Sequence, residues 1–357
     1  MTSPVARINL PALRHNLARV REVARGCRVL AAIKANGYGH GLLEVARALS
    51  GADGFAVARV EEAMKLRHAG FDGQIMVLEG FTSLPELILC RDSDLDLVIH
   101  DRFQVQLLDK LPAGKSPLRL WIKVDTGMHR VGLQTGEAET VINQIRGHED
   151  VTLVGVMTHF ANADDRQNDY TRQQLEAFNP FIDTELEVSI ANSAGILGWP
   201  DSHRGWVRPG IMLYGTSPFP DSVAQQEGLE PVMTLRTRLI AVRHLHKGDS
   251  IGYGSTWTCP EDMPVGVAAI GYGDGYPRHA PNGTPVLVNG QRAALAGRVS
   301  MDMITLDLRH ISNPRVGDSV VLWGEGLPAE EIARAAGTIT YELFCRLTGR
   351  VKYRYEE

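Results

Sequence analysis

Residues 29–58 read VLAAIKANGYGHGLLEVARALSGADGFAVA. The stretch opens with the apolar run Val29–Ala35, which is typical of a buried strand, and continues through a glycine-rich turn. Leu42–Leu49 then repeats apolar residues every three or four positions, which predicts an amphipathic helix. Gly54–Ala58 is apolar again, so the stretch has the strand–helix–strand order of a parallel βαβ unit.

The same alternation continues through the first two-thirds of the chain. Val60–Ala69 is a second clear amphipathic segment. Eight strands separated by helices favour an α/β fold of the (β/α)8, TIM-barrel type over an open doubly wound sheet. The predicted strands are Val29–Ala35, Gly54–Ala58, Ile75–Glu79, Asp96–His100, Leu118–Val124, Leu153–His159, Glu187–Ala191 and Gly210–Tyr214.

The last third of the chain alternates apolar and polar residues without intervening helices. Asn289-Gly290, between Val288 and Arg292, predicts a tight hairpin turn. A helix is expected at Ala329–Ala336. The predicted strands of this region are Val232–Val242, Val265–Ile270, Pro285–Val288 and Ile304–Leu308.

A chain of 357 residues is too long for one small core, which suggests two domains or one large barrel with an appendage. We predict a barrel over residues 1–228 and a smaller, mainly β domain over residues 229–357. Ser217–Gly228, which is polar and contains two prolines, is the natural linker between them.

Composition excludes several classes of function. The chain is 44% hydrophobic and 22% charged, as in soluble enzymes, and its net charge of −5 favours neither nucleic acid nor an anionic membrane surface as a partner. Met1–Asn9 has no long apolar core, so we expect no signal peptide, and no run is long enough to span a bilayer. The scattered cysteines predict neither a metal site nor disulfides and fit a reducing cytoplasm. They are Cys27, Cys90, Cys259 and Cys345.

Polar residues close several of the predicted barrel strands, where the active site of such a barrel lies. Lys34 belongs to Ala31–Gly41, in which an apolar strand delivers one lysine to a glycine-rich turn. Burial lowers the pKa of a lysine, and a neutral amine is what Schiff-base chemistry requires. Tyr38 can reach back as a hydroxyl donor. For Lys34 alone an ordinary surface lysine is the better interpretation, but for the whole string it is the weaker one.

Arg208–Gly215 contains groups that suit a phosphate. Backbone N–H groups after Gly210 could bind its oxygens, and the Ser193 hydroxyl could add a further hydrogen bond. A strand entrance with a capping arginine is an equally good interpretation of these residues by themselves.

Trp121–Gly132 places Lys123, Arg130 and Asp125 on one strand and its following loop. Arg130 suits a substrate carboxylate because a guanidinium binds carboxylates through two parallel hydrogen bonds. A structural ion pair between Arg130 and Asp125 is the alternative.

Other candidates are ambiguous by sequence. A lone histidine such as His159 is more often structural than catalytic, although its place at the barrel rim favours a role in the site. Tyr253 and Tyr272 each lie between two glycines and Tyr276 follows one, as turn residues or exposed acid–base phenols would. Gly297–Asp302 is a polar break before a strand.

Together these strings closely resemble the alanine racemases, which are fold type III enzymes that use pyridoxal 5′-phosphate (PLP). The match covers nearly the whole chain, in order, in both predicted domains, and all the strings in series are much more specific than any one. The matching residues are Lys34, Tyr38, Arg130, His159, Asn192, Ser193, Arg208, Gly210, Ile211, Tyr253, Met301, Asp302 and Tyr341.

The resemblance implies a role for each position. Lys34 is expected to hold PLP covalently, Arg208 to face the pyridine nitrogen, and Arg130 with the Met301 backbone to hold the substrate carboxylate. Asp302 is expected to support this site. The cofactor phosphate and its surroundings are assigned to Tyr38, His159, Asn192, Ser193, Gly210, Ile211 and Tyr341.

The implied reaction is the interconversion of L-alanine and D-alanine by two bases on opposite faces of the substrate. Lys34 removes the proton of D-alanine, and Tyr253 of the partner chain removes the proton of L-alanine. The resemblance further implies a head-to-tail homodimer with shared active sites, to which Met301 also comes from the partner chain. In the family Lys123 is carbamylated and orients Arg130.

The resemblance leaves alternatives. A racemase with broader substrates would carry the same motifs. The sequence also does not distinguish an enzyme that supplies D-alanine for peptidoglycan from one that serves alanine catabolism. A related PLP decarboxylase is expected to have a glutamate at the position of Arg208 and a catalytic cysteine in the β domain, and a non-catalytic PLP-binding protein to lack that domain. Gly37 stands where family members commonly have alanine, so we expect a slightly looser turn beside Lys34.

Overall fold

The structure is a computed structural model that describes residues 3–114, 116–182 and 185–357. Its internal contacts divide the chain into two compact units. The barrel unit comprises Leu17–Gly37 and Gly41–Leu213, and the sheet unit comprises the N-terminal residues up to Asn16 together with Tyr38–His40 and Tyr214–Glu357. The predicted domain boundary after residue 228 stays a prediction.

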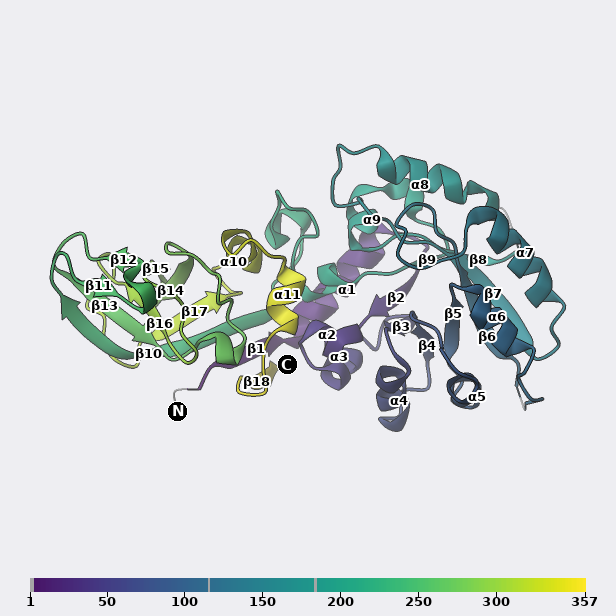
Figure 1. The fold of residues 1–357 in the computed structure, drawn as a ribbon, viewed down its shortest axis with the longest axis horizontal. Helices are drawn as coiled ribbons and strands as arrows, with labels where there is room; N and C mark the ends of the chain where they lie inside the picture. Colours follow the sequence, from purple (N-terminus) through teal and green to yellow (C-terminus); the bar gives the residue numbers. More distant parts are fainter. Residues whose placement is uncertain (1–2, 115, 183–184) are drawn as a thin grey trace. The chain divides into compact units, whose positions relative to one another are not determined.

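The barrel unit contains a closed barrel of eight parallel strands, which confirms the predicted fold class (Figure 1). Parallel pairing carries the carboxyl ends of all eight strands to the same end of the barrel, so the residues that follow them can share one site. The strands are β2 (Arg28–Ala32), β3 (Gly54–Val57), β4 (Gln74–Val77), β5 (Asp96–Ile99), β6 (Leu118–Lys123), β7 (Val151–Met157), β8 (Glu187–Ser189) and β9 (Trp206–Val207).

Helices lie around these strands in Figure 1. The predicted helices at Leu42–Leu49 and Val60–Ala69 are confirmed as α3 and α4, each within one residue at its end. The helices are α1 (Leu10–Val23), α2 (Lys34–Tyr38), α3 (Leu42–Ala48), α4 (Val60–His68), α5 (Leu84–Asp92), α6 (Arg102–Leu108), α7 (Thr135–Arg146), α8 (Tyr170–Phe178) and α9 (Ser193–Gly198).

The core of the barrel unit is a cluster to which seven strands contribute one buried side chain each. Its two tryptophan rings meet edge to face with their centroids 6.4 Å apart. The members are Leu30, Ala56, Met76, Val98, Trp121, Met157 and Trp206.

The eighth predicted strand is wrong. Ile211–Tyr214 forms a short 3-10 turn, η3, whereas the strand that closes the barrel is β9, four residues earlier, which pairs with β2 and β8. Pro209 has no N–H to give to a neighbouring strand, so the ladder cannot continue through it. Its carbonyl still accepts a hydrogen bond of 2.9 Å from the Ala32 N–H.

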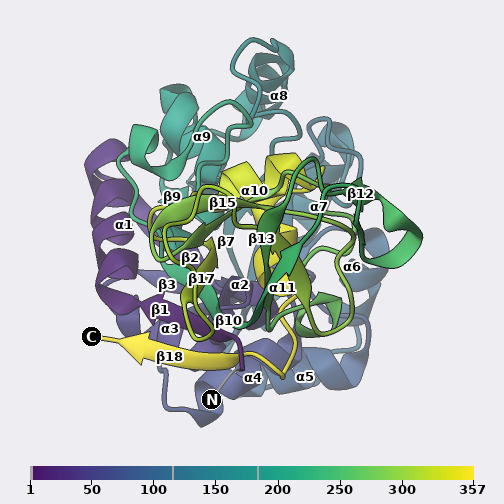
Figure 2. The ribbon, with the colours of Figure 1, turned by 90° about the vertical axis from the view of Figure 1, so that its left-hand side faces the viewer.

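The sheet unit contains an eight-stranded sheet in the order β13-β16-β15-β14-β17-β10-β1-β18. The pairs are antiparallel except β1 with β18, which bring the two ends of the chain side by side (Figure 2). The strands are β1 (Val5–Asn9), β10 (Met233–Leu245), β13 (Met263–Ala268), β14 (Pro285–Val288), β15 (Gln291–Leu295), β16 (Ile304–Asp307), β17 (Ser319–Trp323) and β18 (Lys352–Glu356), beside a separate pair, β11 (Ser250–Ile251) with β12 (Trp257–Thr258).

The predicted hairpin is confirmed. β14 and β15 pair directly across Asn289 and Gly290, whose φ angles are 48° and 79°, both in the left-handed region that this turn requires. The predicted helix is α10 (Ala329–Ala335), and α11 (Thr340–Cys345) follows it unpredicted.

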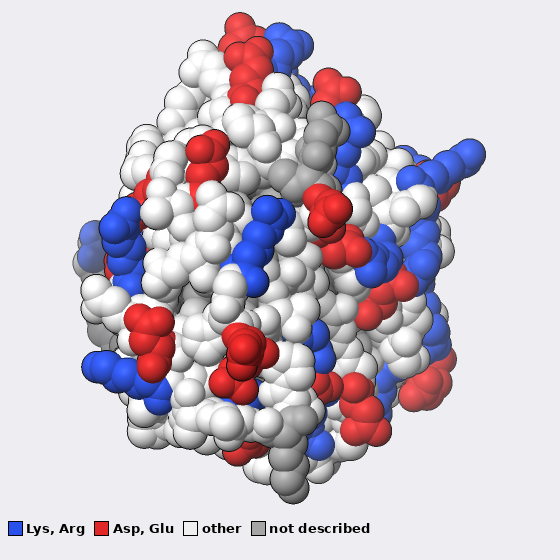
Figure 3. All heavy atoms as spheres, turned by 90° about the vertical axis from the view of Figure 1, so that its right-hand side faces the viewer, with Lys and Arg blue, Asp and Glu red and all other residues white. Residues whose placement is uncertain are grey.

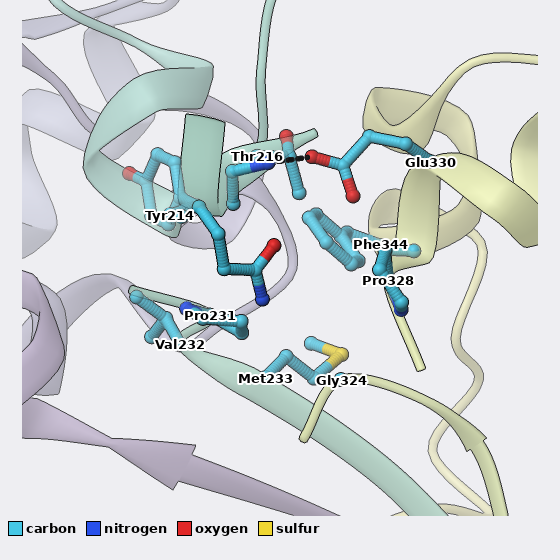
Figure 4. Close-up of a pocket in the computed structure, with 13 residues that line it drawn as sticks. Tyr214, Thr216, Pro231, Val232, Met233, Gly324, Pro328, Glu330 and Phe344 are labelled. Carbon is cyan, nitrogen blue, oxygen red and sulfur yellow. Dashed lines mark hydrogen bonds between the residues drawn. The ribbon is translucent and has the colours of Figure 1, made fainter. Parts of the chain in front are cut away.

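Glu330, on α10, lies at a cavity of about 10 Å³ inside the sheet unit, roughly the space of one water (Figure 4). One carboxyl oxygen accepts hydrogen bonds from the amides of Ser217 (2.8 Å) and Ala224 (2.9 Å). The other oxygen has no partner among the described residues. Burial raises the pKa of Glu330. The carboxyl group therefore ties the 217–224 segment to α10.

Candidate active site

Lys34 begins a turn with an unusual backbone. Ala35, Asn36, Gly37 and Tyr38 have φ angles of 53°, 56°, 62° and 50°, so the chain makes a left-handed turn directly after β2 and Ile33. This conformation costs an L-residue roughly 1–2 kcal/mol. Hydrogen bonds hold the turn, from the Gly37 N–H to Ile33 O (2.8 Å) and from the Leu42 N–H to the Asn36 side chain (3.0 Å). Strain of this kind is typical of functional sites.

The Lys34 amine is half-buried, and its surroundings favour the neutral form. Burial lowers the pKa of Lys34, and the positive charge of Arg130 lowers it further. The direction agrees with the sequence prediction, and a neutral amine can attack a carbonyl carbon.

Lys123, the last residue of β6, is buried as well. Burial, followed by the charges of Arg130 and Arg208, lowers the pKa of Lys123 to about 8. Within the described ranges its amine makes no hydrogen bond or ion pair. The barrel unit therefore gathers two lysines and two arginines in one region, and no described carboxylate forms an ion pair with any of them.

Arg130 lies in the loop after β6, and the alternative that Asp125 pairs with it is wrong. Asp125 accepts hydrogen bonds from the amides of Gly127 and His129, each 3.0 Å, and contacts the His129 ring at 3.1 Å. None of the carboxylates that the structure describes pairs with Arg130. Its guanidinium is therefore available to a ligand.

Arg208 follows β9 and is buried without a carboxylate partner in the described chain. Its guanidinium donates to the Ser189 hydroxyl and to the Thr158 carbonyl, both at 2.5 Å, and to the Ile190 carbonyl at 3.2 Å. Burial lowers the pKa of Arg208 to about 10. His159 lies beside it, and burial lowers the pKa of His159 well below its ordinary value. A buried positive charge of this kind favours an anionic or strongly polar ligand.

Ser193 begins α9, and Asn192 caps it by accepting a hydrogen bond from the Gly195 N–H (2.9 Å). The buried Ser193 hydroxyl accepts hydrogen bonds from the Gly210 N–H (2.9 Å) and the Met212 N–H (3.4 Å). The Ile211 N–H has no acceptor in the described part of the chain. The Ser193 hydroxyl proton and the Ile211 N–H could therefore each donate a hydrogen bond to a phosphate oxygen.

Two predicted cofactor residues belong to the sheet unit. Tyr38 is buried and stacks on Tyr214, with ring centroids 4.6 Å apart, and its ring lies 5.9 Å from that of Tyr341 on α11. Burial and the neighbouring Tyr341 raise the pKa of Tyr38, so its hydroxyl is a hydrogen-bond donor rather than a base. Tyr214 was not singled out in the sequence, although it lies within Arg208–Gly215.

The structure separates the three glycine-flanked tyrosines. Tyr253 is 68% exposed and Tyr272 is 38% exposed, whereas Tyr276 is fully buried. Tyr276 stacks on Trp323, with centroids 6.3 Å apart, so it is a core residue. Tyr253 is the most exposed of the three.

Met301 and Asp302 lie in an exposed loop of the sheet unit. The Met301 carbonyl accepts a hydrogen bond of 2.9 Å from the Gly273 N–H, and Arg350 forms an ion pair of 2.8 Å with Asp302. Arg350 escaped the sequence analysis because it lies far along the chain from every motif.

The described residues contain neither a candidate metal site nor a candidate membrane-spanning helix. No group of histidine, cysteine and carboxylate side chains among them could hold a metal ion. No helix among them has the length and apolarity needed to cross a membrane. Acidic and basic side chains are interspersed on the face shown in Figure 3.

Two family models match the chain. "Alanine racemase, N-terminal domain" matches residues 8–218, and "Alanine racemase, C-terminal domain" matches residues 232–355. An alanine racemase of Nitrosococcus oceani is 52% identical over 352 residues, which cover 98% of this chain and 99% of that protein.

Solved structures of alanine racemases are similar to this chain over its whole length. A biosynthetic alanine racemase from Pseudomonas aeruginosa is 44% identical, with a TM-score of 0.97 and 100% of each chain covered. An alanine racemase from Bartonella henselae with covalently bound pyridoxal phosphate is 28% identical, with a TM-score of 0.90 and 100% of each chain covered. Fold, site and full-length similarity lead to one conclusion: this chain belongs to the alanine racemase family of isomerases.

Proposed function

We propose that this protein interconverts L-alanine and D-alanine with PLP held by Lys34, and with Lys34 and the partner subunit's Tyr253 as the two bases. The observation that carries the proposal is the Lys34 amine, whose pKa is lowered at the carboxyl end of β2, among cations with which no described carboxylate forms an ion pair. Such a site suits an anionic cofactor that forms a covalent bond with an amine.

The residues present fit PLP. Its phosphate suits the Ser193 hydroxyl and the Ile211 amide, and its pyridine ring suits the buried guanidinium of Arg208. His159 and Asn192 support these groups, His159 beside Arg208 and Asn192 through the cap of α9. Gly210, Tyr38 and Tyr341 complete the proposed cofactor set.

PLP, when bound to an amino acid, withdraws electrons from Cα and makes its proton removable. The chain must then supply a base on each face, because racemisation removes a proton from one side and returns one to the other. Lys34 Nζ takes the proton of D-alanine, and the partner subunit's Tyr253 Oη takes that of L-alanine. The Arg208 guanidinium can donate a hydrogen bond to the pyridine nitrogen but cannot accept one from a protonated nitrogen, so it would favour the unprotonated ring, which is the weaker electron sink.

The substrate carboxylate is assigned to Arg130 and the Met301 amide, with Asp302 in support. Tyr253 and Met301 are 68% and 52% exposed, so both can enter the site of a second copy. We therefore propose a head-to-tail homodimer in which each active site takes Tyr253 and Met301 from the partner. We also propose that it works in the cytoplasm.

Lys123 is proposed to be a carbamate. A lysine with a pKa of about 8 has a neutral fraction at physiological pH. The ammonium first loses a proton. The neutral amine then attacks CO2, an N–C bond forms while one C–O π bond of CO2 becomes the carboxylate, and a second proton is released, so a group of charge +1 becomes −1. That anion would pair with Arg130 and offset the surrounding cations. Incubation with 13C-bicarbonate should give a carbamate 13C signal, which Lys123→Ala should abolish.

The alternatives predict different observations. The residue that follows β9 is Arg208, whereas the resemblance implies a glutamate at this position in the related decarboxylases. The sheet unit is present, whereas a single-barrel binder is expected to lack it. A broader-substrate racemase stays open, as does the choice between D-alanine supply for peptidoglycan and alanine catabolism. Assaying a panel of L-amino acids for the D-product decides the substrate range.

The central experiment is borohydride reduction of the holoenzyme followed by peptide mapping. We expect the pyridoxyl label on Lys34, and we expect Lys34→Ala to lose the label and nearly all racemisation. Lys65→Ala, an exposed lysine on α4, is the control. Label on another residue would overturn the assignment.

Tyr253→Phe tests the second base. Exchange of the Cα proton with deuterated solvent should be impaired more for L-alanine than for D-alanine. Equal loss in both directions, or wild-type exchange, would refute two separate bases.

A further inference from the structure

Two loops of the sheet unit are joined by backbone hydrogen bonds on both sides of Met301. The Tyr272 N–H donates to Ser300 O (3.1 Å), and the Gly273 N–H donates to Met301 O (2.9 Å). A trans peptide is planar, so the Met301 N–H points opposite to the Ser300 carbonyl. The bond that fixes Ser300 O therefore also fixes the direction of the Met301 N–H. That N–H has no acceptor among residues 3–114, 116–182 and 185–357.

Arg350 ties the same two loops together through side chains. Its Nε lies 3.1 Å from the Asp274 carboxylate, and its Nη2 lies 2.8 Å from the Asp302 carboxylate. Asp274 ends the short turn η6 (Tyr272–Asp274), and Asp302 directly follows Met301. The Arg350 guanidinium fork thus contacts both of the loops whose hydrogen bonds orient the Met301 amide.

The Asp274 end of this bridge is buried and held by several hydrogen bonds. Asp274 is 2% exposed, and its carboxylate accepts a hydrogen bond from the Gly271 N–H (2.9 Å). Its carbonyl accepts one from the Thr348 N–H (3.1 Å), and the Thr348 hydroxyl donates to Gly273 O (2.9 Å). The segment after α11 therefore packs directly on the η6 loop, and Arg350 reaches Asp302 from a fixed base.

The geometry points to Arg350 as a positioning residue for the substrate carboxylate. It does not touch the substrate, but it holds the Asp274 and Asp302 loops in register so that the Met301 N–H keeps its direction. This inference rests on the proposed role of the Met301 amide. A hydrogen bond to a carboxylate depends steeply on its angle, so loss of the fork should weaken carboxylate binding before it weakens proton transfer.

The two ion pairs of Arg350 are expected to contribute little to the stability of the fold. The Arg350 side chain is 51% exposed, and solvent-exposed ion pairs contribute little to folding. A fork that joins two loops matters more for the relative placement of those loops than for the folding of either.

The experiment compares Arg350→Met, Arg350→Lys and a control in the PLP-loaded enzyme. The control is Arg346→Met, which removes a local ion pair with Glu342 (3.2 Å) on the same segment. The measurements are KM and kcat for alanine and the inhibition constant of propionate, which has the carboxylate but no amine. Sedimentation and melting temperature monitor assembly and folding.

We expect Arg350→Met to raise KM and the propionate inhibition constant together, by about tenfold, with a smaller change in kcat. Arg350→Lys keeps one charge but has no fork, so its values should be intermediate. Arg346→Met should match the wild type. If Arg350→Met fails to fold, Asp302→Asn, which keeps the Asp274 contact, should show the same joint rise.

A lower melting temperature in Arg350→Met with KM and the inhibition constant within about twofold of wild type would reduce Arg350 to a structural residue. Failure of the proposed function would give a different result, because the wild-type enzyme would then not racemise alanine. An active wild type with unchanged Arg350→Met and Asp302→Asn constants would overturn this inference alone.

Discussion

Nη2 of Arg208 lies 3.4 Å from Nδ1 of His159. The guanidinium carries its charge at all ordinary pH values, so protonation of the imidazole would place two positive charges side by side in a buried site. Burial, followed by the charge of Arg208, explains why the pKa of His159 is lowered.

His159 should therefore destabilise the fold in mild acid. A histidine in the unfolded chain takes up a proton near pH ~6.5, whereas folded His159 does not, so the unfolded state binds more protons below that pH. The free energy of unfolding should fall as pH drops below about 6.5, by up to about 1.4 kcal/mol per pH unit for this group. Urea unfolding at a series of pH values should give a smaller slope for His159→Gln than for wild type. His68→Gln, which replaces an exposed histidine of α4 that forms no ion pair among the described residues, is the control, and equal slopes in all three proteins would contradict the prediction.

Gly37→Ala should destabilise the turn that carries Lys34. The φ angle of Gly37 is +62°, and an added Cβ would lie 3.0 Å from Val45 Cγ2. We expect a loss of about 1 kcal/mol from the backbone and a further loss from the Val45 contact. Gly70→Ala is the matched control, because its φ is +83° with no atom within 4 Å. Urea unfolding should show the larger loss for Gly37→Ala, and equal losses would mean that Val45 moves aside freely. Glycine adopts this φ without strain. Whether Gly37 also makes the turn beside Lys34 looser than an alanine would stays a prediction.

Ser193→Ala should weaken PLP binding. The substitution removes a hydroxyl that accepts hydrogen bonds from buried amides, including the Gly210 N–H at 2.9 Å, and that is assigned to the cofactor phosphate. We expect the dissociation constant of PLP to rise at least about tenfold, as for loss of one hydrogen bond to a charged group. Titration of the apoenzyme with PLP measures it. Ser202→Ala, a buried serine that donates to Trp199 O (2.6 Å), should change stability but not PLP affinity. The same PLP affinity in both variants would show that Ser193 does not bind the cofactor phosphate.

Tyr276→Phe should stabilise the protein and leave racemisation unchanged. The Tyr276 hydroxyl is buried with no hydrogen-bond partner in the described residues, which is unfavourable. Removing it should raise the free energy of unfolding by about 1 kcal/mol. Tyr170→Phe should do the opposite, because the Tyr170 hydroxyl donates to Gly127 O at 2.7 Å. A loss of stability in Tyr276→Phe would indicate a partner such as a buried water.

Local signals explain why much of the fold was predictable. β2, α3 and β3 follow directly from the apolar spacing of residues 29–58, and the β14–β15 hairpin follows from Asn289-Gly290. The eighth barrel strand was misplaced because Gly210–Tyr214 is as apolar as a strand. Pro209 had marked where the ladder ends, but an apolar run by itself cannot tell a strand from a turn packed in the core.

Long-range pairing was not predictable. β1 lies between β10 and β18, so Val5 pairs with Arg236 and with Lys352. Five alternating residues at an N-terminus carry no information about partners more than 200 positions away. The same limit hid Arg350, whose two carboxylate partners lie 76 and 48 positions earlier in the chain.

The sequence by itself determined the barrel with its β region and the identity of the candidate groups, because periodicity and motif order are local properties of a chain. Tertiary structure alone decided which groups share an environment: it gathered Lys34, Lys123 and Arg208, gave Asp125 to His129 rather than to Arg130, and exposed Tyr253 while burying Tyr276. Charge state, burial and hydrogen bonding depend on distances between residues remote in sequence, and folding sets those distances.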